Sequence, residues 1–62
     1  MIVMEEMIRE KIRYYEQLIE QYKGEAMIHK EQGNMTMASF LEGKASELRS
    51  VITDLLGLMM NV

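Results

Sequence analysis

The chain has 62 residues and a formal net charge of −3 at pH 7, with eight methionines, one histidine and no cysteine. The lack of cysteine excludes disulfides and thiolate metal sites, and a single histidine argues against a catalytic metal centre. The negative charge gives no electrostatic attraction to nucleic acid or to an anionic membrane. A chain this short forms one domain, residues 1–62, and without disulfides or metals it usually needs partner subunits.

Residues 3–32 have the pattern of an amphipathic helix. Apolar side chains recur at alternating steps of four and three residues, which places them at the a and d positions of a heptad, on one side of a helix. The members of this stripe are Ile8, Ile12, Tyr15, Ile19, Tyr22, Ala26 and His29, with Met4 and Leu18 beside it at g positions. Glu5 and Arg9 are four residues apart, the spacing of a helical ion pair.

The segment KEQGNMT, residues 30–36, predicts a break between two helices. Gly33 accommodates the left-handed conformation that ends many helices, and Lys30 lies in the preceding turn, where the helix dipole favours a cation. Asn34 or Thr36 is then placed to cap the next helix by accepting a hydrogen bond from a free backbone amide. So short a connection predicts an antiparallel helical hairpin.

Residues 35–60 predict the second helix, whose apolar stripe is wide. The a and d positions hold Ala38, Leu41, Ala45, Leu48, Ile52, Leu55 and Met59. Flanking apolar residues are Met37, Val51 and Leu58 at g and Leu56 at e. A hairpin has one seam and cannot cover stripes this wide, and soluble monomers rarely expose so large an apolar strip.

We therefore expect an all-α protein in which hairpins assemble into a homo-oligomeric four-helix or larger bundle. Its expected core consists of Ile8, Ile12, Tyr15, Ile19, Tyr22, Ala26, Leu41, Ala45, Leu48, Ile52, Leu55 and Met59. The mixture of residue types at a and d does not decide between a dimer and a higher oligomer.

A second stripe on the 35–60 helix contains only small, uncharged residues: Thr36, Ser39, Gly43, Ser46, Ser50, Thr53 and Gly57. One interpretation is an ordinary polar surface. The other is a surface that packs closely on another helix, because each mid-helix glycine costs about 0.8–1.0 kcal/mol relative to alanine. We favour packing, and the candidate second interface is Ser39, Phe40, Gly43, Ser46, Ser50 and Gly57.

Phe40 occupies a c position beside that stripe. Met7, Tyr14 and Ile28 occupy the c positions of the first helix. Single exposed apolar residues are normal, but four of them indicate a further contact surface.

No catalytic constellation is recognisable in the sequence. Glu25 and His29 are four residues apart and offer two metal ligands, but no second pair accompanies them, so His29 is better explained as a shield for the end of the core. No Gly-rich phosphate loop occurs. We expect no enzyme activity, no cofactor and no metal. With no cysteine and no run of about 20 apolar residues, we expect a cytoplasmic protein without a membrane segment.

The length, the central turn and the heptads resemble Rop, the RNA-binding hairpin of plasmids, which is a homodimeric four-helix bundle. That resemblance implies the fold and dimerisation. The segment GNMTMASFLEGKASELRSVI is similar in style to small helical hairpins of phages and prophages of Gram-positive bacteria. This second resemblance implies an accessory or inhibitor protein.

Two functions remain open. The favoured one is a non-enzymatic interaction protein that binds itself and a further, unidentified protein. The alternative is Rop-like RNA binding by the outer side of the first helix, through Arg9, Arg13, Tyr14, Gln17 and Gln21. Glu6, Glu10 and Glu20 lie among these residues and would repel phosphate, so nucleic acid is the less favoured partner.

Overall fold

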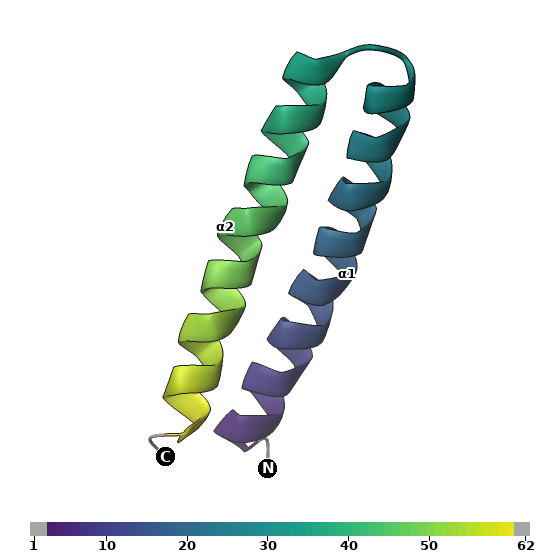
Figure 1. The fold of residues 1–62 in the computed structure, drawn as a ribbon. Helices are drawn as coiled ribbons and strands as arrows, with labels where there is room; N and C mark the ends of the chain where they lie inside the picture. The colour runs from purple at the N-terminus through teal and green to yellow at the C-terminus, as the bar shows by residue number, and fades with distance from the viewer. Residues whose placement is uncertain (1–2, 61–62) are drawn as a thin grey trace.

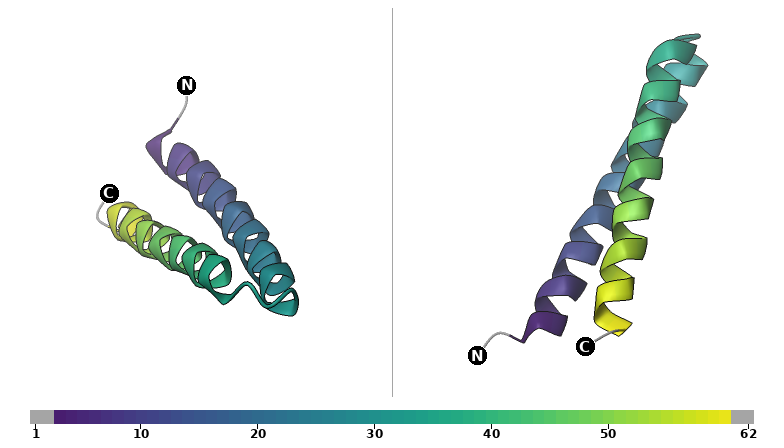
Figure 2. Two further views of the ribbon diagram at one scale, coloured as in Figure 1. Left: turned by 90° about the horizontal axis from the view of Figure 1, so that it is seen from above. Right: turned by 90° about the vertical axis from the view of Figure 1, so that its left-hand side faces the viewer.

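The computed structural model describes residues 3–60, which form two α-helices, α1 (Met4–Glu31) and α2 (Met35–Met60). The helices run antiparallel and side by side, and both ends of the chain lie opposite the turn (Figure 1). Their axes are tilted relative to each other (Figure 2). The predicted hairpin is confirmed, with α1 one residue shorter at each end than expected. Residues 1, 2, 61 and 62 of the predicted domain lie outside the described residues.

The end of α1 has the geometry that Gly33 predicts. Gly33 has a φ of 79°, in the left-handed region. Its amide donates to the carbonyl of Lys30 at 3.0 Å, and the amide of Asn34 donates to the carbonyl of His29 at 2.8 Å. These two bonds make a Schellman motif, which gives hydrogen-bond partners to carbonyls that the helix end leaves free.

The start of α2 is capped by Asn34, one of the two residues that the sequence offered. Its side-chain Oδ1 accepts a hydrogen bond from the backbone amide of Met37 at 3.2 Å. Thr36 instead lies inside the first turn of α2. The same three-residue connection therefore ends one helix and begins the next.

The start of α1 has no side-chain cap at Val3. Glu5 and Glu6 lie in the first turn, where negative charge is favourable beside the helix dipole. Glu5 also pairs with Arg9 at 3.0 Å, as the spacing predicts. Both side chains are more than half exposed, so the pair adds little to stability.

The best-buried part of the hairpin lies near the turn. Ala26, Ala38 and Leu41 form a buried cluster against which Tyr22 packs. Alanine on a helix contact lets two backbones approach closely. Among the described residues only six are buried, and no large side chain is completely buried. The hairpin alone thus has a thin core.

Two glycine substitutions should change stability in opposite directions. Gly33→Ala should lower the free energy of unfolding by about 1–2 kcal/mol, because alanine is strained at a left-handed position. Gly24→Ala should raise it by up to about 1 kcal/mol, because Gly24 is inside α1 and an added Cβ meets nothing within 4 Å. Urea denaturation at one fixed protein concentration measures both, and an equal sign for the two variants would contradict this account of the turn.

Candidate functional site

The hairpin is a slab one helix thick, with a seam between α1 and α2 and two broad faces. The structure places all twelve residues of the expected core along the seam. Five of them are buried: Ile8, Ile19, Ala26, Leu41 and Ala45. The other seven are half-buried: Ile12, Tyr15, Tyr22, Leu48, Ile52, Leu55 and Met59. Their role as the core of an oligomer stays a prediction.

One broad face is rich in apolar side chains. In an antiparallel pair, the g positions of both helices lie on the same side of the seam, and the c positions lie beside them. We define the apolar face as Met4, Met7, Tyr14, Leu18 and Ile28 of α1 with Met37, Phe40, Val51 and Leu58 of α2. Eight of these nine side chains are exposed, and Leu18 is half-buried.

A shallow groove of about 180 Å³ crosses the middle of the apolar face. Leu18, Tyr22, Leu48 and Val51 provide its apolar lining, and Lys44 and Glu47 its polar lining. The ammonium of Lys44 lies 5.1 Å from the centre of the Phe40 ring and 6.0 Å from that of Tyr22. At these distances the cation is attracted to both rings. Lys44 therefore lies over aromatic side chains and does not divide the apolar face.

The opposite broad face carries most of the charges. We define the charged face as Glu6, Arg9, Arg13, Glu16, Glu20, Lys23 and Lys30 of α1 with Glu42 and Arg49 of α2. Lys30 and Glu42 join the two helices through an ion pair of 2.8 Å. Four acidic and five basic side chains are mixed here, so the face has no large region of one sign.

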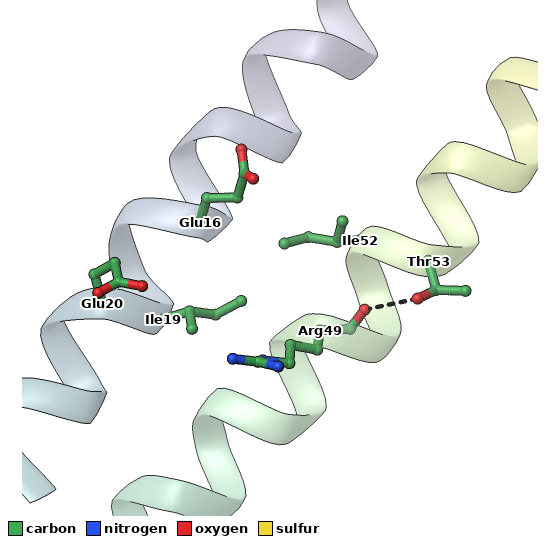
Figure 3. Close-up of a pocket in the computed structure, with 6 residues that line it drawn as sticks. All are labelled: Glu16, Ile19, Glu20, Arg49, Ile52 and Thr53. Atoms are coloured by element: carbon green, nitrogen blue, oxygen red, sulfur yellow. Dashed lines mark hydrogen bonds between the residues drawn. The ribbon is translucent and has the colours of Figure 1, made fainter.

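A groove of about 520 Å³, larger than the one on the apolar face, lies on the charged face (Figure 3). Glu16 and Glu20 stand on α1, Arg49 reaches from α2 toward them, and Ile19 and Ile52 point toward each other between the helices. The Thr53 hydroxyl donates to the backbone carbonyl of Arg49 at 3.1 Å. The groove thus offers two carboxylates and a guanidinium in an open setting, an arrangement suited to charge recognition.

The small-residue stripe lies on the outer side of α2, beside the charged face, and its member Thr53 lines the groove there. Its members are exposed except for Gly57, which is half-buried. A Cβ added at Gly43 or Gly57 meets nothing within 4 Å, so neither glycine is packed inside the hairpin. The Ser50 hydroxyl donates to the Ser46 carbonyl of its own helix at 3.5 Å. Phe40 belongs instead to the apolar face.

Glu25 and His29 do not make a metal site with other residues. Within residues 3–60, no three His, Asp or Glu side chains gather closely enough to hold a metal ion. Glu25 accepts a hydrogen bond from the Gln21 side chain at 3.3 Å. His29 is half-buried on the seam, and its Nδ1 has no hydrogen-bond partner among the described residues.

Both the g residues and the c residues of the apolar face can be recognised in the sequence, but the heptad pattern of each helix alone does not place them on one surface. In the sequence alone, the g residues widen the apolar stripe of each helix, and the c residues indicate a separate contact surface. The pairing of the helices shows that both sets lie on the same side of the slab. The signal was therefore present in the heptad positions once α1 and α2 are paired antiparallel.

Comparisons of the chain with protein-family models, with curated proteins and with solved structures give no match. The resemblances to Rop and to phage hairpins therefore stay predictions. In the described part of the chain, neither helix combines the length and the apolar character needed to span a membrane.

Gly43→Ala distinguishes the two interpretations of the small-residue stripe. Since its Cβ would meet open space in the hairpin, alanine should raise the free energy of unfolding by up to about 1 kcal/mol through helix propensity. Thermal and urea unfolding measure this. A loss of about 1–3 kcal/mol through overpacking would instead place the stripe against another chain, and Ser46→Leu should then exaggerate the loss.

Proposed function

We propose that the protein is a non-enzymatic interaction module that works as a homo-oligomer of helical hairpins. The observation that carries the proposal is the imbalance between core and surface. Six residues of the described chain are buried, whereas thirteen large apolar side chains are exposed. Exposed apolar surface of this extent is typical of protein contacts.

The size of the chain supports the same proposal. A 62-residue protein without cysteine has no disulfide to stabilise it, and its hairpin buries little apolar surface. Association with further helices is the remaining source of stability, because it removes from water the apolar side chains that the single hairpin leaves exposed. A cytoplasmic location agrees with the absence of cysteine and forms part of the proposal.

A homo-oligomer should be visible in the mass of the purified chain. We expect light scattering coupled to gel filtration to give twice the chain mass of 7.3 kDa or a higher multiple. The melting temperature should rise with protein concentration, since dissociation and unfolding are then coupled. A monomeric mass with a concentration-independent melting temperature would contradict the proposal.

Leu48→Ala tests whether a half-buried seam residue is covered by another chain. A Leu→Ala change at a fully buried site costs roughly 2–5 kcal/mol, and less at a site that stays partly in water. Leu48 is half-buried in the single hairpin. We therefore expect a cost in the full range at concentrations where the oligomer forms. Ser46→Ala, on the exposed side of the same turn, is the matched control and should change the free energy by under about 0.5 kcal/mol.

A further inference from the structure

The two broad faces of the hairpin have different chemistry, and only one of them suits a second copy of the chain. Resting on the proposed self-association, we infer that the apolar face is the contact surface. Two hairpins pack apolar face to apolar face in a four-helix bundle, and the charged faces point outward.

The area of the face matches what a stable dimer needs. The Cα atoms of the slab extend over 48 × 18 × 10 Å, so a broad face measures 48 × 18 Å, about 860 Å². A standard protein interface buries about 800 Å² on each partner. A symmetric dimer uses the same patch on both subunits, so two copies of this face have matching length and width.

A second hairpin on the apolar face would also cover seam residues that the single hairpin leaves half-buried. Tyr22 and Leu48 occupy d positions, and both line the groove on this side of the slab. They are half-buried because α1 and α2 cover them from one direction only. In a four-helix bundle formed through this face, the d and g positions would point toward the second hairpin, so Leu18 and Val51 would become core residues together with Tyr22 and Leu48.

The charges on the two faces favour the same arrangement. Beside the apolar residues, the g and c positions of this side hold five charged side chains, two basic and three acidic: Lys11, Glu25, Lys44, Glu47 and Asp54. Because the signs are mixed, a second copy meets no field of one sign. Burying the charged face would instead desolvate nine ionised groups, including the Lys30–Glu42 pair.

Glutamate substitutions on the two faces test the assignment. Leu58 and Leu56 lie in the same turn of α2, exposed by 57% and 44%, on the apolar and the charged side respectively. Leu58→Glu should raise the concentration at which the oligomer half-dissociates by roughly tenfold or more, because it buries a carboxylate in an apolar contact. Leu56→Glu should change that concentration by less than about twofold.

A second pair tests the end of the slab near the turn. Phe40 lies on the apolar face, so Phe40→Glu should dissociate the oligomer. Met27 lies on the opposite face, so Met27→Glu should leave the oligomer intact. The two native side chains are exposed to a similar degree, 53% and 63%. The carboxylate introduced by Phe40→Glu stands four residues before Lys44, a favourable helical spacing, so the helix itself should persist. Sedimentation equilibrium gives the mass, and circular dichroism at the same concentrations reports the helix.

A thiol-labelling measurement serves where a glutamate variant unfolds. The chain has no cysteine, so Leu58→Cys and Leu56→Cys each introduce the only thiol. Raising the protein concentration through the association range should slow labelling of L58C about tenfold and leave that of L56C nearly unchanged, since labelling requires exposure.

The outcomes separate the two proposals. A monomeric wild-type chain overturns the proposed function and this inference together. An oligomer that survives both Leu58→Glu and Phe40→Glu, or in which L56C is the protected thiol, overturns the face assignment and leaves self-association standing. An oligomer that persists with protection of neither thiol has its contact elsewhere, such as the small-residue stripe, and also overturns the assignment.

Discussion

Two antiparallel helices meet along a single seam, and a seam one a/d stripe wide is the only surface that a hairpin can bury by itself. The exposure of the remaining apolar side chains follows from that limit on the buried surface. The a and d side chains are buried or half-buried, whereas g residues such as Val51 and Leu58 stay exposed although they are as apolar as the core. The stripes encoded in both helices are wider than the seam, and this excess apolar width is the physical basis of the association that we propose.

The seam also determines which part of the hairpin is most completely buried. Near the turn, Ala26, Ala38 and Ala45 are small enough for close backbone approach and are almost completely buried. Toward the termini the a positions hold larger residues, such as Ile12 and Ile52, which remain half-buried. The turn-proximal half therefore has a packed core of its own, while the other half gains more from being covered.

Much of the fold follows from local sequence rules. The heptad steps predict both helices, and Gly33 predicts the end of α1, because few other residues adopt its φ of 79° at low cost. The choice between Asn34 and Thr36 as the cap could not be made from sequence, since both offer an oxygen at a suitable spacing. It depends on which backbone amides the Schellman turn leaves free, and in the structure the Asn34 side chain accepts from Met37.

The candidate site was harder to predict, because a face belongs to a pair of helices and not to one. Phe40 lies beside the small-residue stripe on the helix surface, and the sequence therefore places it in two candidate surfaces, one with Ser39 and Gly43 and one with the c residues of the first helix. Across the seam, however, its side of the slab is the one that carries Met7 and Tyr14. Only the antiparallel pairing shows which flank of α1 adjoins which flank of α2.

The two faces differ in how much water they can lose. On the charged face, Lys30 of α1 pairs with Glu42 of α2 at 2.8 Å, and both side chains are about half exposed, so this electrostatic attraction between the helices acts in contact with solvent. Such pairs gain little from burial, because desolvation offsets the Coulombic attraction. Apolar side chains gain about 25 cal/mol for each Å² removed from water. The hairpin thus has one face whose ion pairs persist in contact with water and one whose apolar side chains are stabilised by removal from water. This difference supports the apolar face as the surface of the association that we propose.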